Sequence, residues 1–515
     1  MNLLAADVSP LHLPLGKVRA DSRPPSAVLL RRTGRLQQFR GSTREVTFRG
    51  NLSPSDGEMD GVRGSRAILI SWWGTKFVGT LKKSLALCCI ISLALGWHSW
   101  AQEASLFKAG VARVNLTPPM EMKAALGGYG ARMSKPAIGV HDAIWAKALV
   151  LAKGERRFAL VTADVLGFPP QFKAAVIERL AGENWRADQI MLLPSHTHTS
   201  FDLMALHPGN TFGIPQVGVF HKELFEHTAN QLAKVIREAG GKLNPVVAGS
   251  TTVSVPDRNR NRRRGGAVHD TDLTVTRVDA SDGRPLAVLV NWTAHPTFMD
   301  AEDMLFSGDW PGHLQRMMEA LIGEGVTALF YNGAEGDQSP TPPPEAASNW
   351  ERAERYGREM GIRAWRAWEK IQPGEVKGFG YHTETMKLPE RTWHPDFMKT
   401  GGAEYGLNET MMRGFLDALQ PTQTRSTCFR MGDLVILGVP GEMAAQLGMD
   451  TKTKVRQITG ASSVTIGGLA DEWVSYILPA EEYRKGGYEA SMSFYGETFG
   501  STMVEGILRA VKGLK

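Results

Sequence analysis

Short apolar runs typical of β-strands alternate with amphipathic helical stretches along residues 102–515, and no linker divides them. An apolar run bounded by turn residues indicates a strand, whereas apolar residues recurring every three or four positions indicate a helix. The alternation predicts one large α/β domain, built as a layered mixed sheet with flanking helices, rather than two or three average domains. We expect strands at residues 111–116, 145–152, 157–163, 189–193, 246–253, 273–278, 286–292, 327–331 and 435–437, and helices at 170–181, 222–239, 312–322 and 350–371.

The composition is that of a soluble globular protein, with 42% apolar and 22% charged residues. The net charge of +6 suggests a nucleic-acid partner, but this charge is unevenly distributed. Residues 1–83 hold 14 Lys and Arg against 6 Asp and Glu, so the remainder has a net charge of about −2. We therefore expect no nucleic-acid partner. Only Cys428 lies outside the apolar run that contains Cys88 and Cys89, so neither an internal disulfide nor a cysteine zinc site is expected in the body of the protein.

The first hundred residues contain two distinct segments. Residues 1–80 are rich in Arg, Gly, Ser and Pro and keep no hydrophobic period, which predicts disorder. Residues 81–101 have the pattern of a secretory signal peptide, because Lys82 and Lys83 precede a 12-residue apolar run and Ser99-Trp100-Ala101 forms a small-x-small cleavage site. This run is too short to span a bilayer as a helix. We expect an exported protein, periplasmic or extracellular, whose mature chain begins near Gln102.

A signal peptide normally stands at the start of a chain, so its position near residue 81 needs an explanation. One interpretation is that translation begins near Val78 and that residues 1–77 are an artefact of the gene model. The other is that they form a true basic extension. In either case residues 102–515 form the folded domain.

Four loops that follow expected strands carry residues suited to chemistry. In an extended chain, positions i and i+2 point to the same side, so we expect His196 and His198 to present their imidazoles together. The other three loops carry His295, Ser339 and Glu442. Because sites in α/β sheets lie beyond the carboxyl ends of strands, these loops are expected to share one cavity.

Such a set of residues suits zinc. Two or three histidine nitrogens and one carboxylate leave an open position for water, which is the pattern of a catalytic site. Zinc lowers the pKa of its bound water and polarises a carbonyl, and a further histidine carries protons or orients the water. A purely structural role is the alternative for each residue. A lone histidine after a strand is more often a hydrogen-bonded loop residue, and a serine in a Gly/Pro loop is more often a turn residue. The glycine-rich stretch 126–130 is interpreted as a turn, since no strand–helix unit of nucleotide-binding spacing surrounds it.

From about Lys108 to Gly500 the sequence resembles the catalytic domain of the neutral/alkaline (non-lysosomal) ceramidases and their bacterial relatives. Six pieces follow the order of the family's motifs. They are GVARVNLTP at 110–118, HTH at 196–198 (family HTHS), NWTAHPT at 291–297 (family NWxxxHxxS), GDQSP at 336–340 (family GDVSP), GE at 441–442, and the stretch 468–490, which is similar to the family's GLxNxYxxYxTTxEEYxxxxYEG.

The resemblance implies a site for one zinc ion per chain. His196, His295, Glu442 and Tyr476 stand at the positions of the family's zinc ligands. Tyr476 enters through the resemblance alone, because a tyrosine in an apolar stretch looks like a core residue. The implied reaction is the hydrolysis of an N-acyl amide bond in ceramide or a related N-acyl lipid, which implies a small-molecule or lipid substrate and contact with a membrane surface.

The resemblance also implies roles around the zinc. His198 and Tyr488 match residues that hydrogen-bond the substrate or its transition state, and Ser339 matches the family's catalytic serine. Arg262 is expected to be the active-site, substrate-binding arginine, with Arg260 as the alternative because the Asn-Arg pair repeats. Two mechanisms stay open, attack by zinc-activated water and a Ser339 acyl-enzyme.

The sequence departs from the family pattern at positions that concern substrate binding more than zinc binding. Residues 199–201 lack the Gly-Pro of the family's HTHSGP motif, and 477–479 lack its Thr-Thr. Full ceramidases continue into a C-terminal immunoglobulin-like domain, which we expect this chain to lack. Two alternatives are a non-catalytic surface or binding protein with the enzyme's fold, and a dinuclear hydrolase related to the metallo-β-lactamases. The second requires Asp-His directly after HxHx, where this chain has Ser200 and Phe201.

Overall fold

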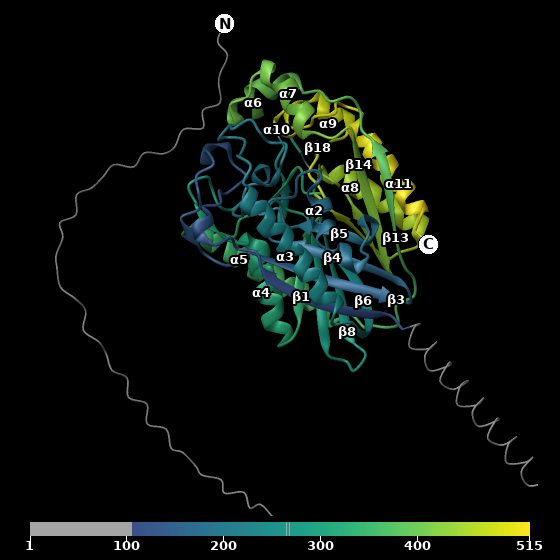
Figure 1. Cartoon of the computed structure of the whole chain (residues 1–515). Helices are drawn as coiled ribbons and strands as arrows, with labels where there is room; N and C mark the ends of the chain where they lie inside the picture. The colour runs from purple at the N-terminus through teal and green to yellow at the C-terminus, as the bar shows by residue number, and fades with distance from the viewer. Residues whose placement is uncertain (1–105, 264, 267, 515) are drawn as a thin grey trace, which may run out of the picture. The chain divides into compact units, whose positions relative to one another are not determined.

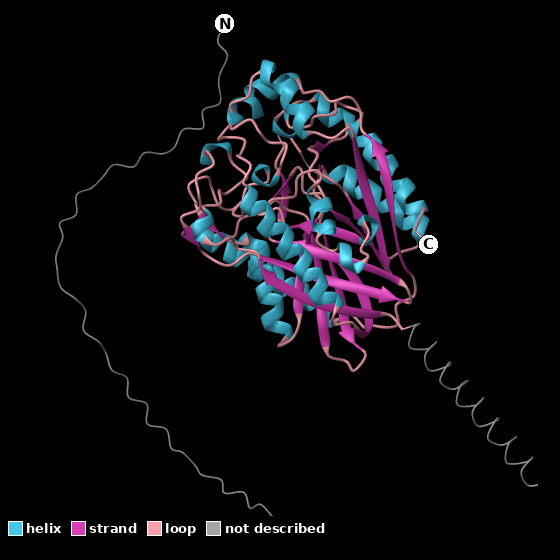
Figure 2. Ribbon diagram, in the orientation of Figure 1, coloured by secondary structure: helices cyan, strands magenta, loops and turns pink. Residues whose placement is uncertain are grey.

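The computed structural model describes residues 106–263, 265–266 and 268–514. The expected basic extension and signal peptide, residues 1–80 and 81–101, lie outside the described residues. The described chain forms four layers, with a large and a small sheet stacked between two sets of helices (Figures 1 and 2). The predicted class, a layered mixed sheet with flanking helices, is confirmed.

The larger sheet has eight strands of mixed direction. The pairs β11–β9 and β4–β5 are parallel, and the other pairs are antiparallel. The two edge strands, β11 and β5, also contact each other, so the sheet curls and brings its edges together. In spatial order the strands are β11 (Thr327–Asn332), β9 (Pro285–Trp292), β8 (Asp272–Ala280), β6 (Asn244–Ser254), β1 (Lys108–Asn115), β3 (Trp145–Lys153), β4 (Arg156–Ala163) and β5 (Ile190–Pro194).

The smaller sheet packs against the inner face of the larger one. Its strands, in order, are β13 (Phe379–Lys387), β14 (Gln423–Met431), β15 (Leu434–Gly438) and β17 (Ser463–Gly467). The period-two alternation of strands builds this interface. In β4, Phe158 and Leu160 join the core between the sheets, while Ala159 and Val161 join the core under the helices.

Three groups of helices bury the outer faces of the sheets. The helices α2 (Phe172–Glu178) and α3 (Lys222–Gly240) cover the β1–β5 part of the large sheet, and α4 (Asp309–Ile322) and α5 (Asn349–Glu369) cover its β8, β9 and β11 part. The helices α7 (Glu409–Leu419), α8 (Ala445–Thr459) and α11 (Phe499–Lys512) contribute to the core on the outer face of the small sheet. None of the helices within the described ranges combines the length and the apolar character that a bilayer crossing requires.

The expected elements agree with the structure apart from their ends. The helix expected at 170–181 is shorter, because α2 ends at Glu178 and a 3-10 turn follows. The helix expected from residue 312 begins earlier, at Asp309. Strand β5 begins at Ile190, since Gln189 closes a 3-10 turn and caps Arg186.

Short elements fill the end of the molecule where the parallel strands finish. Two small β-pairs carry residues of the candidate site, and several short helices enclose it. These are β7 (Asn259–Asn261) with β12 (Gln338–Pro340), β16 (Glu442–Met443) with β18 (Tyr476–Ile477), and η6 (Pro395–Lys399), α6 (Gly401–Tyr405), α9 (Ala480–Arg484) and α10 (Tyr488–Ser491), while β2 (Gly139–Val140) pairs with β10 (Leu305–Phe306).

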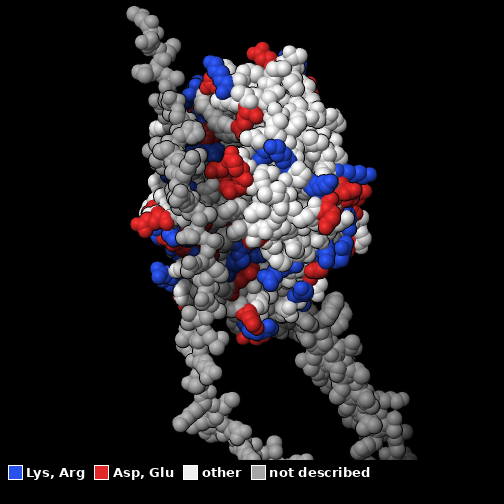
Figure 3. Space-filling model, turned by 90° about the vertical axis from the view of Figure 1, so that its left-hand side faces the viewer, with Lys and Arg blue, Asp and Glu red and all other residues white. Residues whose placement is uncertain are grey.

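Charged side chains of both signs are mixed on the surface. On the face drawn in Figure 3, Lys and Arg lie among Asp and Glu, and broad uncharged areas separate them. Many of these side chains form ion pairs, such as Arg355 with Glu351 on α5 and Arg237 with Glu183. Exposed pairs of this kind contribute little stability individually.

Candidate metal centre

Four loops meet beyond the carboxyl ends of parallel strands. His196 follows β5, His295 follows β9, Glu335 follows β11, and Glu442 follows β15. The contacts between their side chains confirm that these loops converge, as expected from their positions after strands. Whether these residues bind a metal is a prediction that the geometry below supports.

Asn332, at the end of β11, ties three of these loops together. Its side-chain amide donates to the carbonyl oxygens of Ser195 at 3.2 Å and Ala294 at 2.9 Å. Its Oδ1 accepts from the backbone N–H groups of Ala294 and Gly333. One fully buried side chain therefore fixes the spacing between the histidine loops.

His196 leaves strand β5 in an unusual backbone conformation. Its φ is 68°, in the left-handed region that a histidine rarely adopts. The chain is therefore not extended here, and the expected reason for pairing His196 with His198 is wrong. The pairing itself occurs, because the turn brings the two Nε2 atoms to 3.4 Å. Strain at a buried ligand loop is typical of functional sites.

Two histidines face one carboxylate at the centre of the cluster. Nε2 of His295 lies 3.0 Å from Oε2 of Glu442, and Nε2 of His196 lies 3.4 Å from the same oxygen. The other oxygen of Glu442 accepts from Nε1 of Trp473 at 2.8 Å. All three members of the cluster are buried.

The hydrogen bonds of the histidines fix their tautomers. Nδ1 of His196 faces the carbonyl oxygen of Leu166 at 2.6 Å, and Nδ1 of His295 faces that of Glu335 at 2.8 Å. A carbonyl oxygen can only accept, so each Nδ1 carries a proton, and Nε2 is the ring atom with which each histidine faces the Glu442 carboxylate. An ion placed between these atoms would be held by both Nε2 atoms and by the carboxylate oxygen.

A divalent ion fits this arrangement. Zinc with ligand bonds of about 2.1 Å places tetrahedral ligand atoms about 3.4 Å apart. The separations of 3.0 and 3.4 Å between the histidine nitrogens and Glu442 are close to that value. Two imidazoles and one carboxylate, each held by a hydrogen bond from behind, are the donor set of a catalytic zinc site.

Burial and neighbouring groups shift the pKa values of three residues in the cluster. Burial, with the nearby Arg262 guanidinium, lowers the pKa of His295 to about 4. Burial and the neighbouring His196 and His295 lower the pKa of His198 well below its usual value. Burial alone would raise the pKa of Glu442, but His196 and His295 outweigh it and hold that pKa well below the usual range. Near pH 7 His198 and His295 are thus neutral and Glu442 is ionised.

Tyr476 joins the cluster through strand pairing. In the parallel pair β16–β18 it lies opposite Glu442, and burial together with the nearby Glu442 carboxylate raises the pKa of its phenol well above the usual value. The guanidinium of Arg262 donates to the Tyr476 oxygen at 3.0 Å and to Glu489 at 2.8 Å. Arg260, the alternative arginine, is exposed and points elsewhere, lining a separate hollow. Of the two candidates, Arg262 is therefore the one in contact with the cluster.

His198 is held on the other side of the cluster. Its ring packs against Tyr129 at an interplanar angle of 56°, with centroids 5.2 Å apart, and Gly128 lies so close that a Cβ there would be 2.4 Å from Nδ1. Gly128 also has a φ of +90°, so glycine is required at this position for two reasons. Nδ1 of His198 is buried against Gly128 and has no hydrogen-bond partner among the described residues.

Arg132 is a buried residue that the sequence did not single out. Its guanidinium donates to the carbonyl oxygens of His198, Gly127, Asp300 and Asp303. It thereby ties the His198 loop to the glycine-rich turn and to the loop after His295. No local pattern marks such a residue, since its partners are all backbone carbonyls far apart in sequence.

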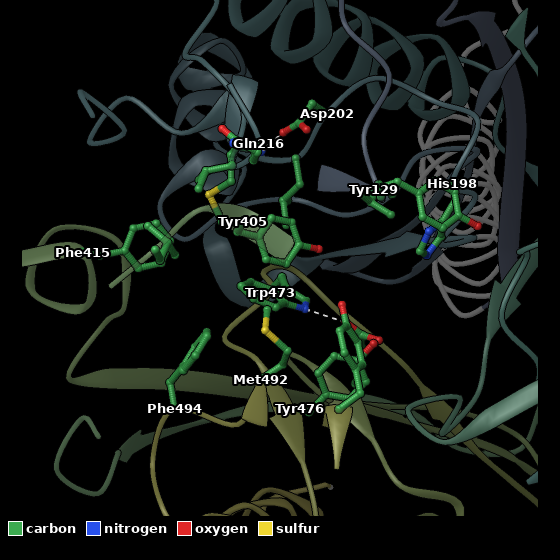
Figure 4. A pocket seen from close by; sticks show the side chains of 18 of the residues that line it. Tyr129, His198, Asp202, Gln216, Tyr405, Phe415, Trp473, Tyr476, Met492 and Phe494 are labelled. Carbon is green, nitrogen blue, oxygen red and sulfur yellow. Dashed lines mark hydrogen bonds between the residues drawn. The ribbon is translucent and has the colours of Figure 1, made fainter. Parts of the chain in front are cut away.

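A pocket of about 110 Å³ opens beside the cluster. His196, His198, Glu442, Tyr476 and Tyr488 line one side of it. The side opposite His198 is apolar, as Figure 4 shows for Phe415, Met492 and Phe494, and the dashed line there marks the bond from Trp473 to Glu442. The remaining walls include Phe397, Tyr405 and Leu407, which come from η6, α6 and the loop after it.

Ser339 lies apart from this pocket. It sits in β12 opposite Arg260 and lines the separate hollow with Arg260 and Phe298. Its neighbour Gln338 contacts His295 through the backbone carbonyl, so the strand is near the cluster although the serine belongs to a different hollow. Tyr488, by contrast, lines the pocket, with its ring centroid 6.1 Å from that of Tyr476. The catalytic roles of Ser339, His198 and Tyr488 stay predictions.

The sequence is similar to one known protein family and to several of its members. The family described as neutral/alkaline non-lysosomal ceramidase, N-terminal, matches residues 107–347 and 410–504. A neutral ceramidase of Pseudomonas aeruginosa is 23% identical over 501 residues, which cover 80% of this chain and 72% of that protein. A neutral ceramidase of Drosophila melanogaster is 28% identical over 263 residues, which cover 46% of this chain and 36% of that protein.

The fold is shared with a solved structure. The crystal structure of the Pseudomonas aeruginosa neutral ceramidase matches with a TM-score of 0.66 and 19% identity, over 79% of this chain and 75% of that chain. The stretch 348–409 lies outside the family match. That stretch contains α5, β13, η6 and α6. It also contributes three residues that line the pocket, Phe397, Tyr405 and Leu407.

Proposed function

Because this chain belongs to the neutral/alkaline non-lysosomal ceramidase family, as its motifs led us to expect, we propose that it hydrolyses the amide bond of ceramide or a related N-acyl lipid at a bound zinc ion. The observation that carries this proposal is the buried cluster in which the Nε2 atoms of His196 and His295 lie 3.4 and 3.0 Å from one carboxylate oxygen of Glu442. Two imidazole nitrogens and a carboxylate are donors that suit zinc.

His196, His295, Glu442 and Tyr476 would hold the ion. When bound, it would supply a Lewis acid that polarises the amide carbonyl and lowers the pKa of water. Trp473 orients Glu442 by donating to its outer oxygen, and Arg262 orients Tyr476 in the same way. Because these ligand side chains are already held in place, they need not reorient when the reaction takes place.

His198 is the group we assign to proton transfer. It is neutral at pH 7, lines the pocket and holds its Nε2 3.4 Å from that of His196. As the C–N bond of the amide breaks, the leaving amine nitrogen needs one proton, and the attacking water loses one. His198 can accept the proton from water and pass it to the amine, with the acyl group leaving as a carboxylic acid.

We infer that water, rather than Ser339, is the nucleophile. The supporting observation is that Ser339 lines a hollow with Arg260, whereas the pocket contains His196, His198 and Tyr488. A nucleophile must lie within reach of the general base and of the reacting carbon. Of the tyrosine hydroxyl groups that line the pocket, Tyr488 is the one we assign to donate to the developing oxyanion.

The pocket indicates a substrate with a short apolar group. Its volume of about 110 Å³ is below the range of about 300–1,000 Å³ usual for drug-sized ligands. Phe397 and Leu407 close it from the stretch that the family match leaves out. We therefore expect these two residues, together with pocket residues inside the match such as Phe415, to set the lipid specificity of this chain. A lipid substrate would also bring the pocket mouth to a membrane surface.

The test is an assay of acid release. The protein, loaded with one equivalent of zinc, is incubated with N-acyl amines and ceramides of graded acyl length, and the released acids are measured. Release that depends on zinc and is abolished in His196→Ala supports the proposal. Absence of release from every substrate by a zinc-loaded protein would favour a non-catalytic binding role for the same fold.

We also infer export through cleavage after residue 101. The support is the pattern of Lys82 and Lys83, the apolar run 84–95 and the small-x-small site at 99–101. Mass spectrometry of the protein recovered from culture medium or periplasm tests it. A mature N-terminus at Gln102 is expected, and a chain retained in the cytoplasm with residues 81–101 intact would refute export.

A further inference from the structure

Glu335 is a carboxylate buried without any polar partner among the described residues. Its side chain is 0% exposed, and neither of its oxygens accepts a hydrogen bond. Buried carboxyl groups are nearly always hydrogen-bonded or paired, because removing them from water is otherwise costly. The functions assigned above use its backbone carbonyl and leave its side chain without a role.

The carboxyl group points into the metal centre. One of its oxygens lies within 4.8 Å of ligand atoms of both His196 and Glu442. Its own backbone carbonyl accepts from Nδ1 of His295 at 2.8 Å. The residue is therefore anchored to one predicted ligand through its backbone and directed at two others through its side chain.

The surrounding backbone makes room for this side chain. A Cβ placed on Gly468 would lie 2.4 Å from Oε2 of Glu335 and 2.2 Å from the carbonyl oxygen of Gly333. Any larger residue at 468 would displace the carboxyl group. The polar atom on that side is a carbonyl oxygen, which cannot donate to a carboxylate, so an ionised Glu335 can find its partner only at the centre.

We propose that Glu335 is a second carboxylate ligand of the ion held by His196, His295, Glu442 and Tyr476. This rests on the proposed metal centre. With both carboxylates ionised, their two negative charges balance the two positive charges of the ion, so the buried centre is neutral overall. A bound ion would also give Glu335 the partner that its burial demands, and zinc accepts a fifth ligand.

The alternative is that Glu335 stays protonated and only fills space beside the ligands. The two roles predict different effects on metal affinity and on the spectrum of the bound metal. A ligand changes both the affinity for the ion and its electronic spectrum, whereas a space-filling acid changes neither when it is replaced by glutamine. An outer-shell residue lowers metal affinity by about 10–100-fold, so a larger loss indicates direct binding.

The experiment measures metal binding without reference to activity. Zinc affinity is determined by competition with a chromophoric chelator for the wild type, Glu335→Gln and Glu335→Ala. The cobalt-substituted proteins are compared by their visible absorption, which reports the ligand set. We expect a loss of affinity of more than about 100-fold in both variants, and an altered cobalt spectrum. Glu335→Gln keeps the size of the side chain, so the comparison survives if Glu335→Ala does not fold.

Two further variants separate the possible failures. Asp309→Asn is the matched control, because Asp309 is another fully buried carboxyl group with an unpartnered oxygen. It belongs to none of the three groups of described residues whose ligand atoms lie close enough to share an ion, so its replacement should leave affinity and spectrum unchanged. His196→Ala tests the centre itself. Unchanged affinity and spectrum in Glu335→Gln, with binding lost in His196→Ala, would overturn the role of Glu335 alone. Unchanged binding in His196→Ala would overturn the metal centre as well.

Discussion

Glu442 and Tyr476 lie directly opposite each other in the parallel pair of strands β16 and β18. Strand pairing, rather than a flexible loop, thus sets the distance between these two predicted ligands. Arg262 fixes the tyrosine from the far side, and Trp473 fixes the glutamate. The centre is therefore rigid on this side, which is what pre-organised catalysis requires.

Removing the Arg262 side chain tests this support. In Arg262→Met the Tyr476 phenol loses its donor, while Glu489 keeps its ion pair with Arg263. We expect turnover to fall by about 100-fold, the loss typical of one missing charge-stabilising donor, with zinc content unchanged. Steady-state kinetics and metal analysis measure the two effects. Arg260→Met is the matched control and should behave as the wild type; equal losses in both variants would contradict the assignment.

Replacement of Ser339 distinguishes the two nucleophiles. If water attacks, Ser339→Ala retains measurable turnover, because the serine lines a different hollow from His198 and Tyr488. Intact-mass spectrometry during turnover should find no acyl adduct on the wild type. An acyl-enzyme lost in Ser339→Ala, together with loss of all turnover, would establish the serine as the nucleophile.

Acyl-chain preference should respond to Phe415. This residue lies on α7 and forms an apolar wall of the pocket. We expect Phe415→Ala to shift the preference towards longer chains, since it enlarges the pocket. Leu416→Ala is the control, because Leu416 is also buried on α7 but does not line the pocket. Both variants should lose about 2–5 kcal/mol of stability, and a shift in preference in both would show that it arises from general loosening.

Stability should depend on pH through Asp309. Burial raises the pKa of this carboxyl group to about 7, well above its value in the unfolded chain. The folded state therefore keeps a proton that the unfolded state releases, so this group's contribution is present at low pH and is lost as pH rises towards and through 7. We expect the wild type to lose on the order of 3 kcal/mol relative to Asp309→Asn between pH 5 and 8. Urea unfolding at both pH values measures this, and parallel pH profiles for the two proteins would contradict it.

The large sheet and the histidine loops could be predicted because their signals are local. Apolar runs such as that of β11 mark buried strands, and each predicted ligand loop follows one. The strands β13, β14 and β17 were not predicted. In β14 the inward positions include Thr424 and Ser426, so the alternation is polar and resembles a loop.

Residues that act through tertiary contacts left no such signal. Tyr476 was found only through the resemblance, since its neighbours are apolar and the strand that pairs it with Glu442 is two residues long. Arg132 binds backbone carbonyls that no motif records. Glu335 lies in the loop that was singled out for Ser339, but it was not itself predicted as a site residue. The signal that could have found it is a carboxylate between Ala334 and Gly336, shortly after an apolar strand.

The most direct test of the centre is anomalous diffraction from crystals grown with zinc, with data recorded on both sides of the zinc absorption edge. We predict one strong anomalous peak within bonding distance of the Nε2 atoms of His196 and His295 and an oxygen of Glu442. Absence of a peak there, or a peak only at the surface cluster of His141, Asp142 and His313, would contradict the account.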